Sequence, residues 1–339
     1  MTLFQSEDAE KKILLILKIL NEAREPLGSR LLAQRMQNDG VMLSERTVRY
    51  HLKLMDERGL TSLVGRHDGR IITELGQEEL SNARVRDKVG MAVSRIEVLA
   101  FNTTFDPVQR RGVLPVNVSL FPAERFAEAL RAMAPAFQQH LFVSELIAVG
   151  KEGSRIGTIS VPGGKVGLAT VCSIVINGVL LKNGIPMDSK FGGILQVCNG
   201  KPLRFVELIH YSGSSLDPSE IFIRGRMTSV RSIVERGEGK MLANFREIPG
   251  PSRELVLRLV ENLQQAGIEG VLSTGEISEP VCQVPVDVNK VGMILVGGLN
   301  PVASVHEIGL EADNQAMSTV VDYNDLENYW DVLARYPER

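Results

Sequence analysis

The segment from residue 44 to residue 76, SERTVRYHLKLMDERGLTSLVGRHDGRIITELG, constrains the fold more than any other part of the chain. It predicts a helix that Ser44 caps and Gly59 ends, because a hydroxyl satisfies free N–H groups and glycine accepts the left-handed conformation after a helix. Two short strands, LTSLV and RIITE, flank a turn built on Asp68 and Gly69. Thr73 then caps a further helix. This segment therefore predicts a helix, a β-hairpin and the start of another helix.

Apolar residues at helical spacing predict two earlier helices, at residues 7–23 and 30–36, with Ser29 capping the second. The complete order is helix–helix–helix–hairpin–helix. That is the order of a winged helix-turn-helix, in which one helix enters the DNA major groove beside a hairpin wing. We place this domain at residues 1–86.

The helix that follows Ser44 has one apolar face and one cationic face, as a DNA-reading helix requires. Val48, Leu52 and Met55 point inward, and two arginines, a tyrosine and a lysine follow at i, i+3, i+4 and i+7 on the other side. Arginine can donate two hydrogen bonds to a guanine edge, and lysine and tyrosine reach phosphates. The predicted DNA-contacting residues are Ser44, Arg46, Thr47, Arg49, Tyr50 and Lys53 on the helix, and Arg66, His67 and Arg70 on the wing. The alternatives are an ordinary solvated helix face, or a winged helix that contacts protein or RNA.

Composition limits the remaining possibilities. A net charge of −3 argues against non-specific coating of nucleic acid, so any DNA affinity must come from a local patch. Cys172, Cys198 and Cys282 are far apart and form no CxxC pair, which predicts a reduced cytosolic protein without a disulfide framework or a metal site. The longest apolar run is shorter than the roughly 20 residues of a membrane span. We therefore expect a cytoplasmic protein with no membrane segment.

Residues 90–330 have a different sequence pattern. Strand-like runs alternate there with helical segments at 123–133 and 252–266, and glycine is frequent. Two short motifs recur there. TTFDP (103–107) is echoed by SSLDP (214–218), and SVPGGKVGL (160–168) by VPVDVNKVGM (284–293). Because the two spacings differ, the second half should carry an insertion. The predicted fold class is α+β, with the winged helix followed by an α/β regulatory domain that has an internal pseudo-twofold repeat.

The winged helix followed by VPGGKVGLATVCSIVINGVLLKNGIPMDSKFGGILQV resembles the nitrogen-responsive repressor NrpR family of archaea and some bacteria. The resemblance covers nearly the whole chain. It implies a homodimer that binds an inverted-repeat operator in double-stranded DNA and represses nitrogen-assimilation genes. It also implies release from DNA when 2-oxoglutarate occupies the regulatory domain as an allosteric effector. The archetype carries two regulatory domains in tandem, whereas this chain has room for one and could work with a second regulatory-domain chain.

A small dicarboxylate needs cations, hydroxyls and free N–H groups in a concave site, and the cleft between two related halves is an obvious place for it. The repeated KVG supplies a lysine and a glycine in each half, and two threonines are expected near the end of a strand. The predicted effector-binding residues are Thr103, Thr104, Lys165, Gly167, Cys172, Asn177, Lys290, Gly292 and Asn300. The alternative is that these glycines mark turns and that these lysines lie at solvated strand edges.

Three other functions stay open. The chain could regulate another pathway in response to a different metabolite, or act as a co-regulator through protein contact. It could also be an enzyme with an accessory winged helix, although the sequence contains no nucleophile elbow, P-loop, metal-ligand cluster or dinucleotide fingerprint. The favoured interpretation is a DNA-binding repressor without catalytic activity or cofactor.

Overall fold

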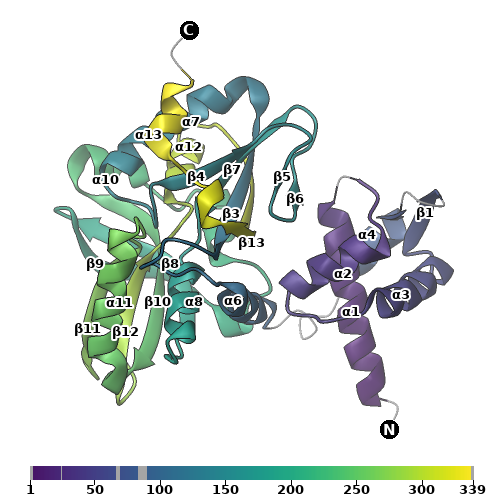
Figure 1. Cartoon of the computed structure of the whole chain (residues 1–339), viewed down its shortest axis with the longest axis horizontal. Coiled ribbons are helices and arrows are strands. Elements are labelled where there is room, and N and C mark those ends of the chain that lie inside the picture. The colour runs from purple at the N-terminus through teal and green to yellow at the C-terminus, as the bar shows by residue number, and fades with distance from the viewer. Residues whose placement is uncertain (1–2, 24, 66–68, 83–89, 337–339) are drawn as a thin grey trace. The chain divides into compact units, whose positions relative to one another are not determined.

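The computed structural model describes residues 3–23, 25–65, 69–82 and 90–336. The chain divides into two compact units, residues 1–98 and 99–339. The boundary falls inside helix α6 (Met91–Asn102), a little beyond the predicted linker at residues 81–90. Each unit has its own core and is described by itself (Figure 1).

The first unit has the predicted winged-helix order. Its elements are α1 (Leu3–Glu22), α2 (Ser29–Asn38), α3 (Glu45–Glu57), β1 (Thr61–Gly65), β2 (Gly69–Ile72) and α4 (Glu74–Asn82). Strands β1 and β2 pair as an antiparallel hairpin. The core is built from apolar side chains of α1, α2 and α3, with Leu17, Leu32 and Leu52 completely buried.

The helix ends confirm two of the three predicted caps. The Ser44 hydroxyl accepts a hydrogen bond from the Thr47 amide at 3.1 Å, and Thr73 accepts one from the Gly76 amide at 3.0 Å. Gly59 follows α3 with a φ of +73°, the conformation for which glycine was expected there. The predicted Ser29 cap is wrong, because α2 begins at Ser29 itself and the Ser29 hydroxyl donates to a Glu45 carboxylate oxygen.

Ser44→Ala is expected to weaken the first turn of α3. Loss of the cap leaves an N–H group of that turn without its partner, which costs about 1 kcal/mol of local stability. Hydrogen exchange followed by mass spectrometry should show faster exchange in residues 45–50. Ser62→Ala, on the exposed face of β1, is the matched control, and equal protection in the two variants would contradict the role of the cap.

Helix α6 corrects one prediction. Thr103 and Thr104 were expected near the end of a strand, whereas they directly follow a helix. Ala92, Ile96 and Leu99 are buried in α6 at i, i+4 and i+7, which is a helical period.

The second unit contains two halves with the same element order, strand–helix–strand–strand–helix–strand. The first half is β3 (Val113–Pro122), α7 (Phe126–Gln138), β4 (Leu146–Gly150), β7 (Lys165–Val171), α8 (Ile174–Lys182) and β8 (Asp188–Cys198). The second half is β10 (Gly239–Pro249), α11 (Arg253–Gln265), β11 (Val271–Ile277), β12 (Lys290–Val296), α12 (Asn300–His306) and β13 (Asp313–Asp322). This βαββαβ order is the ferredoxin-like arrangement. The predicted internal repeat is therefore confirmed.

Each half gives its last strand to the sheet of the other half. One sheet has the order β13-β3-β7-β4-β14, and the other has the order β11-β12-β10-β8-β9, so that β13 lies beside β3 and β8 beside β10. Strands β9 (Lys201–His210) and β14 (Glu327–Asn328) extend the two sheets at one edge. All pairings within the two sheets are antiparallel. Strands β3 and β10 are buried on both faces.

The repeated KVG motif occupies equivalent positions in the two sheets. Lys165 opens β7 opposite Pro122, and Lys290 opens β12 opposite Pro249. The expected insertion also lies in the second half. It consists of α9 (Pro218–Arg224) and α10 (Val230–Arg236), which separate the SSLDP motif from β10.

The second unit also contains shorter elements outside the two βαββαβ halves. They are the hairpin of β5 (Arg155–Ile156) and β6 (Ile159–Ser160), the 3-10 turns η1 (Ala123–Arg125), η2 (Tyr211–Gly213), η3 (Gly250–Ser252) and η4 (Tyr323–Asp325), and α13 (Tyr329–Ala334). Among the described residues, no helix is both long enough and apolar enough to cross a membrane. The same residues contain no group of His, Cys, Asp or Glu side chains that could hold a metal ion.

Candidate nucleic-acid interface and effector pocket

Helix α3 presents the predicted cationic face to solvent. Arg46, Arg49, Tyr50 and Lys53 are exposed, whereas Val48, Leu52 and Met55 on the opposite face are completely buried. The cations are therefore held outward by an apolar side packed into the core. This geometry is the one that a helix needs in order to read a major groove.

Two of these cations are paired along their own helix. Arg49 lies 2.6 Å from a Glu45 carboxylate oxygen, and Lys53 lies 3.9 Å from Glu57. The hydrogen bond from Arg49, and then that from Ser29, hold the pKa of Glu45 below its usual range. Exposed pairs of this kind are worth little in water, so the cations can exchange a carboxylate for a phosphate at small cost.

The wing residue Arg70 is not exposed like the cations of α3. Its guanidinium lies 2.8 Å from Asp56 of α3, and its side chain is 19% exposed. Asp56 also accepts a hydrogen bond from the Thr61 hydroxyl at 2.6 Å. Arg70 therefore braces the hairpin against α3. The other predicted wing residues, Arg66 and His67, lie outside the described residues.

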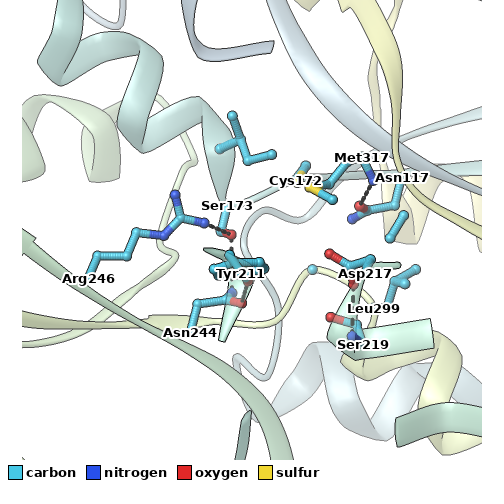
Figure 2. A pocket seen from close by; sticks show the side chains of 13 residues that line it. Asn117, Cys172, Ser173, Tyr211, Asp217, Ser219, Asn244, Arg246, Leu299 and Met317 are labelled. Carbon is cyan, nitrogen blue, oxygen red and sulfur yellow. Dashed lines mark hydrogen bonds between the residues drawn. The ribbon is translucent and has the colours of Figure 1, made fainter. Parts of the chain in front are cut away.

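A pocket lies between the two halves of the second unit (Figure 2). It is a shallow, open recess, whose empty space of about 300 Å³ includes open solvent at its mouth. The turns that follow β7 and β12 form part of its wall, together with β3, β10, β13 and the segment from η2 to α9. Asn117 and Asn244 occupy equivalent places in this wall, within the matching strings NVSLFP and NFREIP. The pocket is therefore located where the repeat led us to expect a cleft.

The positive charge of the pocket comes from Arg246 on β10. This side chain is 1% exposed, and its guanidinium points toward Ser173 in Figure 2. It donates hydrogen bonds to Asn177, Ser173 and Ser189, all of them neutral. Burial lowers the pKa of Arg246 below the ordinary arginine value, but a guanidinium stays protonated at physiological pH.

Arg246 is incompletely satisfied. Its Nε atom is buried without a hydrogen-bond partner. The carboxylate of Asp217 acts on the guanidinium through its charge, but among the described residues the hydrogen bonds of Arg246 go only to neutral groups. A buried cation with neutral neighbours is costly unless an anion joins it. This arrangement favours a ligand that carries a carboxylate or another oxyanion.

Polar groups from both halves complete the wall. The Tyr211 hydroxyl donates to the Asn244 side chain at 2.5 Å, and Asn244 donates in turn to Ser173 at 3.2 Å. Burial, and then the charge of Asp217, raise the pKa of Tyr211, so that its phenol stays protonated. Asp217 caps α9 by accepting a hydrogen bond from the Ser219 amide at 2.8 Å. The pocket therefore offers amide and hydroxyl groups, one cation and one carboxylate, that of Asp217.

Of the nine predicted effector residues, one lines this pocket and one contacts its arginine. Cys172 is in its wall, and Asn177 holds the Arg246 guanidinium. Three others form local backbone contacts outside it. Thr103 donates to the Leu99 carbonyl at 2.8 Å, Thr104 accepts from the Val113 amide at 3.1 Å, and Asn300 bonds both backbone groups of Leu242 at 2.8 and 3.0 Å.

The KVG residues lie at the beginnings of their strands and are not in the pocket wall. Lys165 lies 3.6 Å from Asp313. Gly167 and Gly292 allow close packing of neighbouring side chains, because a Cβ atom there would come within 3.0 Å of a neighbour. Lys290 opens β12. The repeat thus located the cleft, while its most visible motif lies elsewhere.

The sequence did contain a signal for the residue that was missed. Arg246 lies within the mostly apolar string MLANFREI, and a charge inside a strand that is buried on both faces needs a reason. Aligning NVSLFP with NFREIP places Arg246 against Ser119 and shows that only one half carries the cation.

Comparison with known proteins agrees with this architecture. The family model described as NrpR regulatory domains NRD1 and 2 matches residues 89–328. The chain belongs to the NrpR family. The ribonuclease R winged-helix domain matches residues 14–80. The predicted winged helix and the predicted NrpR regulatory domain are therefore both confirmed, as is the resemblance found in the sequence.

Relatives in this family are named as nitrogen regulators. The chain is 38% identical over 317 residues to the global nitrogen regulator NrpRI of Methanosarcina mazei, covering 94% of this chain and 97% of that protein. It is 32% and 33% identical to the global nitrogen regulators NrpR of Methanococcus maripaludis and Methanocaldococcus jannaschii, covering 92% and 94% of this chain but only 54% and 55% of those proteins. As an NrpR family member, the chain is a regulator and not an enzyme.

A solved structure shares the fold. The nitrogen repressor-like protein from Methanococcus jannaschii superimposes with a TM-score of 0.60 at 27% identity. The match covers 70% of this chain and 98% of that one.

Proposed function

We propose that the chain is a cytoplasmic repressor of nitrogen-assimilation genes that binds an inverted-repeat operator as a homodimer. Helix α3 of each copy would enter a major groove, with half-sites spaced by the symmetry of the dimer. The exposed cations of α3 support DNA binding, and the names of the relatives support the nitrogen genes.

We further propose that 2-oxoglutarate occupies the pocket between the two halves and releases the protein from DNA. The observation that carries this proposal is Arg246, a buried cation that has an unpartnered Nε atom and donates hydrogen bonds only to neutral side chains. One carboxylate of the effector would complete its hydrogen bonds. The amides and hydroxyls of Asn117, Asn244 and Ser173 would take the remaining oxygens.

Release would follow from a population shift. A ligand that contacts both halves favours one arrangement of the regulatory domain over another, and a coupling of about 1–3 kcal/mol is typical of allosteric proteins. The same free energy must then appear as weaker effector binding by the DNA-bound protein.

Thermal-shift measurements on the full chain test the effector. At a concentration 100 times its dissociation constant, 2-oxoglutarate should stabilise the protein by about 2.7 kcal/mol. Succinate lacks the keto oxygen and glutamate carries an ammonium group, so both should shift the melting temperature much less. An equal shift with all three acids, or no shift with any, would overturn the assignment of 2-oxoglutarate.

Operator binding is tested separately. Electrophoretic mobility shift with promoter DNA of a nitrogen-assimilation gene should show retardation that 2-oxoglutarate reverses. Retardation that the acid leaves unchanged would keep the DNA-binding proposal and remove the effector proposal.

A further inference from the structure

We infer that β9 is a self-complementary surface through which two copies of the chain pair, edge to edge, into one continuous sheet. Strand β9 ends the sheet β11-β12-β10-β8-β9, so one of its edges has no strand partner in that sheet. The inference deepens the proposed function and rests on its homodimer, since it names the surface that would form it.

The exposure of β9 is unusual for a strand of ten residues. Alternate burial of one face would be expected, but no residue from Lys201 to His210 is fully buried. Leu203 and Leu208 are 40% and 47% exposed. Proteins usually protect long apolar edges, because the free N–H and C=O groups of such an edge recruit another strand.

The sequence of β9 is complementary to itself when it is reversed. In the pairing with β8, Arg204 lies opposite Gln196 and Glu207 opposite Ile194. The extra residue Val206 therefore brings both charged residues to the same face of the sheet. In an antiparallel pair with its twofold axis between Phe205 and Val206, Arg204 of each copy then faces Glu207 of the other. In the same register Leu203 faces Leu208. Both charged residues are exposed, so they are available to a second copy.

Neighbouring registers lose this match. A shift of one residue in either direction places Arg204 opposite an apolar side chain, either Val206 or Leu208. Of these three registers, only the one with its axis between Phe205 and Val206 places Arg204 opposite Glu207 and Leu203 opposite Leu208. Opposite charges directly across an antiparallel pair are stabilising and like charges are destabilising, which selects the register and the partner together.

Bulges restrict what can pair with this edge. Pairing of β9 with β8 shifts register twice, leaving Leu203 and Val206 as the extra residues. Bulges increase the local twist and discourage a generic flat strand. A second β9 has the same twist, and the twofold axis brings identical irregular edges together.

The test is a charge-reversal series on the full chain, measured by sedimentation equilibrium. The wild type is expected to be a dimer. In Arg204→Glu each symmetric contact opposes two carboxylates, and in Glu207→Arg it opposes two cations. Each single variant should dimerise at least about tenfold more weakly.

The double variant Arg204→Glu/Glu207→Arg carries the decisive result. It restores opposite charges at both contacts and should return dimerisation to the wild-type strength. A merely structural role of either residue, such as the 3.0 Å hydrogen bond from Arg204 to Gln196, would not be rescued by the second substitution. Glu261→Arg, on the exposed face of α11, is the matched control and should not change the dimer.

The outcomes separate this inference from the proposed function. A dimer that all variants leave unchanged overturns pairing through β9 and keeps the homodimer. Weak dimers in the single variants without rescue in the double variant also overturn it. A monomeric wild type would remove both β9 pairing and the homodimer, and operator binding would then have to be explained without a dimer.

Discussion

Replacing Arg246 by methionine is expected to abolish stabilisation by 2-oxoglutarate while leaving operator binding intact. Each hydrogen bond to a charged group contributes about 1.5–3 kcal/mol. Loss of a guanidinium that holds a carboxylate should therefore lower the affinity for 2-oxoglutarate by about 100-fold. Isothermal titration and thermal shift measure this directly. In mobility-shift assays the variant should stay on its operator at concentrations of 2-oxoglutarate that release the wild type.

The fold should survive this substitution. Arg246 donates hydrogen bonds only to neutral side chains, so its replacement by an apolar side chain of similar volume removes the desolvation cost of a buried cation and strands no hydrogen-bonded carboxylate among the described residues. Arg253→Met, on α11, removes an ion pair with Glu276 of β11. It is the control and should retain the response. Undiminished stabilisation of Arg246→Met by 2-oxoglutarate would place the effector somewhere else.

The double variant Arg46→Ala/Arg49→Ala is expected to lose operator binding by about 30-fold or more, since each base-reading or phosphate-binding arginine is worth about 1–3 kcal/mol. Both side chains are exposed on α3, so their removal should leave the melting temperature nearly unchanged. Fluorescence anisotropy with labelled operator DNA measures the loss. The dependence of binding on salt concentration should also become shallower where a phosphate contact is removed.

A control on the same helix separates position from charge. Arg58 follows the last turn of α3 and lies 3.0 Å from Glu10 of α1, away from the row formed by Arg46, Arg49 and Lys53. Arg58→Ala should therefore bind operator almost as the wild type does. If the double variant binds as tightly as this control, α3 is not the DNA-reading helix.

The winged helix could be predicted closely because its signals are local. Ser44, Gly59 and Thr73 act on the backbone within a few residues of themselves, and the Asp68–Gly69 pair is itself a turn signal. Ser29 was misjudged because its hydroxyl bonds to Glu45, which is a tertiary contact that no local rule contains. The family and the two-part organisation followed from the order of these signals and from the glycine-rich stretch.

The candidate pocket was harder to predict, because its parts meet only in the folded sheets. Asn177 and Arg246 are 69 residues apart, and they touch only because β8, which follows α8, pairs with β10. Strands β3 and β10 are buried on both faces and show no alternation from which their neighbours could be inferred. The repeat located the cleft, whereas identifying its cation required knowing which strand lies beside which helix.

The exchange of β8 and β13 has a consequence for the origin of this domain. One βαββαβ half could not complete its own sheet, so an ancestral polypeptide with a single half would have been an intertwined pair of identical subunits. Gene fusion would then have joined the two subunits and turned their junction into an internal cleft. Once joined, the two copies could diverge, and the equivalent positions now differ: Arg246 on β10 stands where β3 has Ser119.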